Sequence, residues 1–154
     1  MKICDLLDET HIIFDLNPGS KEQVLTDFTM ELKNRNLIRD EKAILKELLE
    51  RESLGSTGLE KGIAVPHAFT EEVQEPFLAL GIMRKGTDFE AVDQMPTYVL
   101  FFLLGNPAKP GIHLKILAHI CRLVKETRFV DKVQKIKNPL EICELLEKEE
   151  EKIG

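Results

Sequence analysis

Two of the four histidines stand where an imidazole could meet a ligand. His67 and His113 each follow a turn rich in glycine or proline at the end of an apolar run, and in α/β proteins ligands bind in the crevice at strand ends. His113 also falls in the first turn of a predicted helix, where free N–H groups and partial positive charge favour an anion. From spacing alone, a buried and hydrogen-bonded structural histidine is the alternative at each position.

The other two histidines are predicted to have no chemical role. His11 opens a predicted strand beside a charged turn, which indicates a surface residue. His119 comes six positions after His113, a rotation of about 240° on a helix, so these two cannot share one metal-binding face. The sequence also contains no HExxH motif and no CxxC pair. We therefore expect no metal site.

Arg51 and a turn rich in hydroxyl groups precede His67. Isoleucine and leucine at helical spacing over residues 43–52 predict a helix that ends near Arg51. Ser56 and Thr57 follow it, each next to a glycine, so backbone N–H groups there can approach an anion closely. We expect both to support a bound phosphate, and the guanidinium to bind its oxygens.

Pro66 determines how the chain reaches His67. Residues 63–65 are predicted as a brief strand. Proline fixes its own φ and pushes the preceding residue, Val65, toward the extended region. The imidazole of His67 is therefore presented in one restrained direction.

This set of groups suits transient phosphoryl transfer. Such chemistry needs mainly positioning, together with donors around the phosphoryl oxygens. The sequence has no GxSxG motif and no glycine-rich loop with a lysine for a nucleotide, which argues against a nucleotide-using kinase. No cofactor is predicted. A hydrolase with His67 as the base is a weaker alternative, because no paired nucleophile accompanies it.

Strand and helix patterns alternate along the chain, which is typical of an α/β protein. Seven consecutive apolar residues over 98–104 predict a central strand covered on both faces. Capping signals at Ser20, Asp40 and Asn138 predict three helix starts. We expect a mixed sheet of about four or five strands flanked by helices. Strands are predicted at residues 11–16, 63–65, 77–84 and 98–104.

A further helix is predicted to begin near Pro110 or Gly111, where proline and glycine punctuate the chain. It would carry His113 on its packed side, and Thr127 is predicted to cap a short helix after it. The apolar face predicted to pack on the sheet consists of Leu114, Leu117, Ala118, Cys121 and Val124.

Composition predicts one domain, residues 1–154, because 154 residues with 43% hydrophobic content suit one sizeable core. A net charge of −6 argues against a general nucleic-acid or anionic-membrane surface and leaves room for a basic partner. No apolar run could span a bilayer and the N-terminus lacks signal-peptide features, so we expect a cytoplasmic protein with no direct membrane insertion. Cys4, Cys121 and Cys143 are predicted to be reduced core thiols.

The run RESLGSTGLEKGIAVPHA, residues 51–68, resembles the phosphorylation-site signature of enzyme IIA of the fructose/mannitol type, from the phosphoenolpyruvate-dependent sugar phosphotransferase system. HLKILAHICRLV, residues 113–124, resembles the second histidine motif of that family, and the likeness covers essentially the whole chain. The resemblance implies that His67 accepts phosphate at Nε2 from the phosphocarrier protein HPr or a homologue and passes it to a cysteine of an enzyme IIB. It also implies that Arg51 and His113 assist. For Nε2 to attack, Nδ1 should carry the ring proton.

Two branches of this family fit the residues, with sugar uptake as the leading hypothesis and the nitrogen-related branch as the alternative. One serves sugar uptake, and the other is a nitrogen-related branch that uses the same histidine but acts through phosphorylation-dependent protein binding. Both need His67, so the sequence does not separate them or specify a sugar. Glu60 departs from the family, which usually has a small residue there, and its carboxylate could alter partner contact or weaken phosphate binding.

Overall fold

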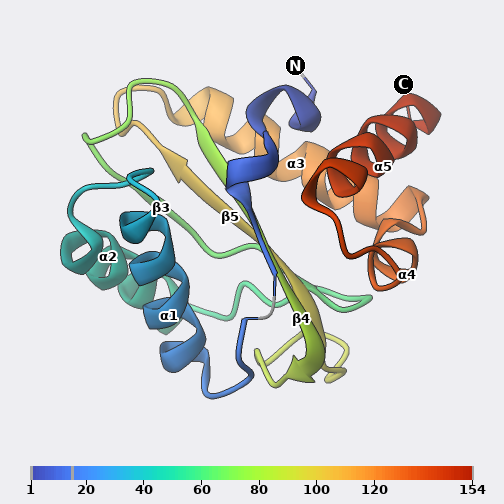
Figure 1. The fold of residues 1–154 in the computed structure, drawn as a ribbon. Helices are drawn as coiled ribbons and strands as arrows, with labels where there is room; N and C mark the ends of the chain where they lie inside the picture. The colour runs from blue at the N-terminus through green and yellow to red at the C-terminus, as the bar shows by residue number, and fades with distance from the viewer. Residues whose placement is uncertain (1, 15, 154) are drawn as a thin grey trace.

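A mixed five-stranded sheet forms the centre of the protein (Figure 1). The structure is a computed structural model that describes residues 2–14 and 16–153. The strands lie in the order β1-β4-β5-β2, and β3 also pairs with β5. Only the β4–β5 pair is antiparallel among the described strands. This confirms the predicted α/β class with a mixed sheet. The strands are β1 (Ile12–Ile13), β2 (Ile63–Ala64), β3 (His67–Phe69), β4 (Phe77–Thr87) and β5 (Thr97–Gly105).

The strands β2 and β3 behave as one interrupted strand along β5. Ile63 pairs with Val99 and His67 pairs with Leu103, so the register is the same on both sides of the break. Pro66 lies in the break because it has no N–H to donate to the ladder. Its carbonyl still accepts the N–H of Leu103 at 3.0 Å. The chain therefore enters β3 at His67, close to the last residues of β5.

Side chains of β5 alternate between two hydrophobic cores, and helices cover both. The two sets, none of them exposed, are Val99, Phe101 and Leu103 on one face and Leu100, Phe102 and Leu104 on the other. The predicted central strand covered on both faces is thus confirmed. One face is covered by α1 (Lys21–Asn34) and α2 (Glu41–Ser53), and the other by α3 (Pro110–Glu126), α4 (Phe129–Val133) and α5 (Pro139–Lys152) (Figure 1).

Three of the predicted helix starts are confirmed by side-chain caps. Ser20, Asp40 and Asn138 each accept a hydrogen bond from a backbone N–H in the first turn of α1, α2 and α5, at 3.1, 3.1 and 2.8 Å. Thr127 ends α3, where its hydroxyl donates to the carbonyl of Leu123 at 2.6 Å, and the same hydroxyl accepts the N–H of Phe129, the first residue of α4, at 3.3 Å, so it also binds the start of the short helix as predicted. The residue directly before α4 is Arg128.

The N-terminal segment corrects two predictions. Two 3₁₀ helices, η1 (Ile3–Leu6) and η2 (Glu9–His11), precede a first strand of only two residues, and Asp15 in the predicted strand lies outside the described residues. His11 ends η2 and is not a surface residue, since its side chain is 16% exposed. Its Nδ1 lies 2.7 Å from the carbonyl oxygen of Leu78, so this imidazole anchors the segment to β4.

The buried face of α3 is rotated from the one we predicted. Ile116, Ile120 and Leu123 face the sheet, whereas Leu114 is 65% exposed. Apolar residues cover more than one side of this helix, so periodicity alone does not decide which side packs. His113 is nevertheless on the buried side, as expected.

The three cysteines are unpaired, as predicted, but they are partly exposed at the edge of the core rather than buried in it. In the part of the chain that the structure describes, none of the helices combines the length and the apolar character that a bilayer crossing requires.

Candidate active site

His67 has its two ring nitrogens in different surroundings. Nδ1 lies 2.8 Å from the carbonyl oxygen of Val65. Because a carbonyl oxygen can only accept, Nδ1 carries the ring proton and Nε2 keeps its lone pair. This is the tautomer that attack through Nε2 requires. The imidazole is half-buried, so the lone pair remains accessible at the end of the sheet.

Arg51, in the last turn of α2, contacts that lone pair. Its Nε donates to Nε2 of His67 at 3.2 Å, and Nη1 donates to the carbonyl of Gly55 at 2.9 Å. Burial lowers the pKa of His67, and Arg51 lowers it further, while the hydrogen bond to Val65 and the charge of Glu52 only partly oppose them. The imidazole is therefore neutral and nucleophilic at neutral pH.

His113 lies beside His67 in the first turn of α3. The two ring centroids are 5.4 Å apart, and the ring of His113 also packs on Phe69 at 4.4 Å. His113 is 2% exposed, and neither ring nitrogen has a hydrogen-bond partner in the described part of the chain. Burial, with a smaller contribution from His67, lowers the pKa of His113 to about 4. Both histidines are thus uncharged in the resting site.

Gly105, the last residue of β5, makes room for His113. A Cβ atom added there would lie 2.4 Å from Nδ1 of His113. Such an approach is far inside van der Waals contact, so a side chain at this position would displace the imidazole. The sequence analysis did not single out this glycine. Its neighbour in space was not visible before the fold was known.

The two histidines open into a shallow depression of about 370 Å³ between α2, β3 and α3. The acidic side chains of Glu47 and Glu50 border it. Leu54, Phe69 and Leu114 also line it and are 84%, 39% and 65% exposed. Large apolar side chains gathered around a polar centre are typical of a protein interaction surface. The sequence analysis did not identify this group of exposed apolar side chains, although the apolar Leu54 in a polar turn indicated one of them.

The hydroxyls of Ser56 and Thr57 are not brought to the depression. Ser56 donates to the carbonyl of Phe89 at 2.6 Å and accepts from the N–H of Gly58 at 3.0 Å. Thr57 is 4% exposed and donates its hydroxyl to the carboxylate of Glu52. These hydrogen bonds fix the turn. Support of a phosphate by Ser56 and Thr57 stays a prediction, and it would require these hydroxyls to change partners.

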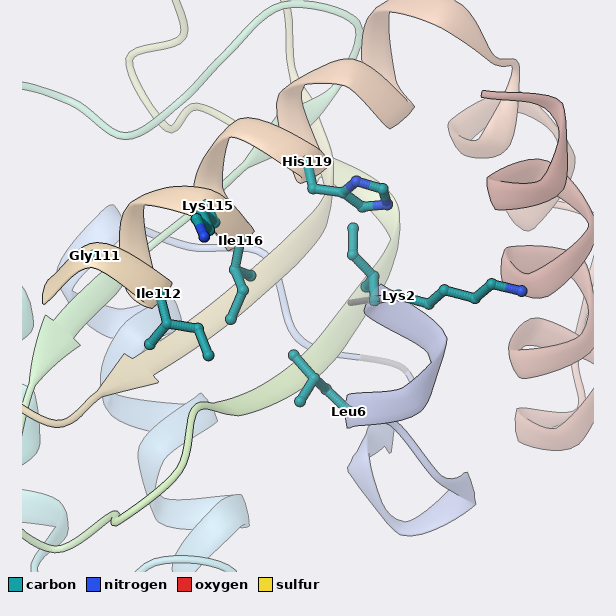
Figure 2. A pocket seen from close by; sticks show the side chains of 8 residues that line it. Lys2, Leu6, Gly111, Ile112, Lys115, Ile116 and His119 are labelled. Carbon is teal, nitrogen blue, oxygen red and sulfur yellow. The ribbon is translucent and has the colours of Figure 1, made fainter. Parts of the chain in front are cut away.

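The remaining candidates lie away from the depression. His119 is on another flank of α3, with Nε2 2.8 Å from the carboxylate of Glu150. It borders a separate apolar hollow of about 530 Å³ between α3 and η1, into which Ile112 and Ile116 point (Figure 2). Glu60 is exposed before β2 and does not line the depression. Within residues 2–14 and 16–153, no three His, Cys, Asp or Glu side chains are grouped to hold a metal ion.

The sequence of the chain is similar to those of known proteins. Residues 5–149 match the family model described as "Phosphoenolpyruvate-dependent sugar phosphotransferase system, EIIA 2". The fructose-specific EIIABC component of Bacillus subtilis is 32% identical over 124 residues, which are 80% of this chain and 20% of that protein. The chain therefore spans about a fifth of the length of this relative.

Two solved structures share the fold. The nitrogen regulatory protein IIA-Ntr from Neisseria meningitidis has a TM-score of 0.83 and 27% identity over 94% of this chain and 98% of that one. Enzyme IIA mannitol, solved in complex with phosphorylated enzyme IIB mannitol from Escherichia coli, has a TM-score of 0.75 and 16% identity over 92% of this chain and 96% of that one. The family match and the Bacillus relative decide the assignment: the chain belongs to the EIIA 2 family of the phosphoenolpyruvate-dependent sugar phosphotransferase system, whose members are phosphotransferases.

Proposed function

We propose that His67 accepts a phosphoryl group at Nε2 from HPr or a homologous phosphohistidine carrier, and passes it to a cysteine of an enzyme IIB. The observation that carries this proposal is the orientation of the ring. Nδ1 is committed to the carbonyl of Val65, and Nε2 is left with its lone pair at the edge of an open depression. A nucleophile held in one direction removes much of the entropic barrier to transfer.

Electrons and protons balance in both steps. The Nε2 lone pair attacks phosphorus, the P–N bond of the carrier breaks, and the carrier imidazole leaves with that electron pair. The ring of His67 becomes more positive, which strengthens its hydrogen bond from Nδ1 to Val65. In the second step a thiolate of enzyme IIB forms an S–P bond, the Nε2–P bond breaks, and His67 returns to its neutral form.

Arg51 and His113 are proposed to stabilise the group in transit. The guanidinium already lies on Nε2, so its N–H groups are within a short movement of phosphoryl oxygens bound there. The ring of His113, on α3, lies beside the ring of His67 and has no competing hydrogen bond within the described residues. Together they provide donors where negative charge develops.

The surroundings of the depression support protein partners rather than a small substrate. Its shallow form and its exposed Leu54, Phe69 and Leu114 favour docking of another protein. Glu47 and Glu50 favour a partner with basic groups around its reactive residue. An enzyme IIB acceptor agrees with the B component named in the Bacillus relative and with the mannitol IIA–IIB complex. We place this transfer in the cytoplasm.

A labelling experiment tests the proposal directly. The protein is mixed with labelled phosphoenolpyruvate, enzyme I, the carrier and a panel of IIB domains. We expect acid-labile, alkali-stable label on the wild-type chain, loss of label in His67→Ala with the fold retained, and transfer to at least one IIB. Undiminished label in His67→Ala would exclude His67 as the acceptor.

A regulatory role in the nitrogen-related branch is the second candidate. The observation that favours it is the likeness to the nitrogen regulatory protein of Neisseria, which extends over 98% of that chain. In this case the phosphorylated and unphosphorylated forms would differ in protein binding, with no transfer to IIB. Affinity capture with each form, compared with the His67→Ala variant, separates this role from sugar uptake.

A further inference from the structure

A buried carboxylate lies directly beside the site residue Arg51. Glu52 is in the last turn of α2, and its side chain is 5% exposed. Its two oxygens accept from the backbone N–H of Thr57 at 3.0 Å, from the hydroxyl of Thr57, and from the amine of Lys21 at 3.0 Å. A buried charge is unfavourable unless it is paired and hydrogen-bonded, and this one is both. The sequence analysis did not single out Glu52.

Lys21 supplies the opposite charge from the first residue of α1. Its amine lies 3.0 Å from Glu52 and 2.9 Å from Glu90, and its side chain is 15% exposed. Burial alone would lower the pKa of Lys21, but the bonds to Glu90 and Glu52 outweigh it and raise that pKa. The lysine is therefore charged, and it ties the start of α1 to the end of α2.

Thr57 connects this ion pair to the imidazole. Glu52 holds both the N–H and the hydroxyl of Thr57, and the carbonyl of Thr57 accepts the N–H of Val65 at 3.0 Å. The carbonyl of Val65 in turn accepts the Nδ1 proton of His67 at 2.8 Å. Three consecutive hydrogen-bonded steps thus lead from the carboxylate to the ring that receives the phosphoryl group.

The turn that this carboxylate closes at Thr57 also holds the arginine, through backbone groups. Gly55 lies in the turn between Glu52 and Thr57, and its N–H donates to the carbonyl of Glu52 at 3.1 Å. Its own carbonyl accepts Nη1 of Arg51 at 2.9 Å, while Nε of Arg51 reaches His67. A turn clamped at both ends therefore sets the position of the guanidinium relative to the imidazole.

We infer that Glu52, neutralised by Lys21, is a positioning residue that holds Arg51 and His67 in register through Thr57. This inference rests on the proposed function, in which these two groups meet the phosphoryl group. Glu52 does not line the depression and contacts no reacting atom. Its charge partly opposes the fall in the pKa of His67, and its hydrogen bonds act through the turn. Misplacement by about 1 Å can lower a rate by up to roughly 100-fold, so loosening this turn should slow transfer substantially.

The test compares Glu52→Gln with a matched control, Glu90→Gln. Glutamine keeps the size of Glu52 but loses the charge that binds Lys21. Its amide has one accepting oxygen, so separate side-chain oxygens can no longer accept the N–H and the hydroxyl of Thr57. Glu90 binds the same lysine but is 73% exposed and has no bond to Thr57. We expect the rate of phosphoryl acceptance from the carrier to fall about tenfold in Glu52→Gln and to change less than about twofold in Glu90→Gln.

Nitrogen NMR and a double variant separate positioning from stability. The Nε–H resonance of Arg51 and the ring nitrogens of His67 should shift in Glu52→Gln and not in Glu90→Gln. Lys21→Met with Glu52→Gln removes both buried charges, so it should recover thermal stability without recovering the resonances or the rate. A folded Glu52→Gln protein with wild-type resonances and wild-type transfer would overturn the inference. Absence of label on the wild-type chain would instead refute the proposed function, and the resonance comparison would still decide the role of Glu52.

Discussion

Substituting Gly105 by alanine is the most direct test of whether the position of His113 matters. The methyl group would lie 2.4 Å from Nδ1 and 3.1 Å from Cγ of His113, whereas ordinary contacts begin at 3.4 Å. The ring is 2% exposed and packed on Phe69, so it has little room to yield. It must move by about 1 Å, away from the strand end and out of its place beside His67.

The expected effect follows from that displacement. Overpacking of this kind costs about 1–3 kcal/mol of stability. A 1 Å error in the position of a catalytic group can lower a rate by about 100-fold, so we expect onward transfer from His67 to fall roughly 10- to 100-fold in Gly105→Ala. Acceptance from the carrier should fall less, because Arg51 and the nucleophile itself keep their hydrogen bonds.

Rapid-quench measurement of transfer to enzyme IIB gives the rate, and a thermal melt on each variant gives the loss of stability. Gly111→Ala is the matched control, since a Cβ at Gly111 in the same helix as His113 meets nothing within 4 Å. The double variant Gly105→Ala/His113→Ala should transfer like His113→Ala alone, because the methyl group then has space. If Gly105→Ala transfers at the wild-type rate with unchanged His113 resonances, the argument from ring position is wrong.

Three further predictions concern charge and protonation. Arg51→Lys keeps the positive charge but loses the paired donors to His67 and Gly55, so acceptance of phosphate should slow about tenfold in rapid-quench assays. An unfolded histidine binds a proton near pH 6.5 and buried His113 only near pH 4, so the unfolded state binds more protons between these values. Stability should therefore fall as pH decreases through that window, by up to roughly 3 kcal/mol, and chemical denaturation of His113→Ala should show a flatter profile. In the phosphorylated protein the pKa of His113 should rise, and an unchanged NMR titration would leave this histidine as scaffold.

Local signals predicted the scaffold well because they act through neighbouring residues. Caps at Ser20, Asp40 and Asn138 depend only on nearby backbone groups, and each is present. The apolar run 98–104 correctly predicted a buried strand, since a strand covered on both faces has no alternation of polar and apolar residues.

Features that depend on distant contacts were not readable. Hydroxyl groups such as those of Ser56 and Thr57 can bind phosphate, but here they bond to Glu52 and to the carbonyl of Phe89, which is 33 residues away in the sequence. The exposed side of α3 was misassigned because apolar residues lie on several sides of the helix, and the outward Leu114 lines the depression beside His67. His67 was predicted by its place at a strand end and phosphoryl transfer by the types of residue around it, while the Nε2 acceptor atom and the partner proteins came from the family resemblance.

The charge state of the resting site explains why a buried histidine suits position 113, beside His67. Both imidazoles are neutral, so Arg51 is the positive group at Nε2 of His67. A phosphoryl group brings about −1.5 to −2 charges, more than one guanidinium neutralises. Because its low pKa comes chiefly from burial, His113 should take up a proton when that anion arrives and release it when the group leaves. A permanently charged residue there would hold phosphate equally before and after transfer, whereas a responsive imidazole stabilises the anion while it is present and leaves the empty site uncharged at that position.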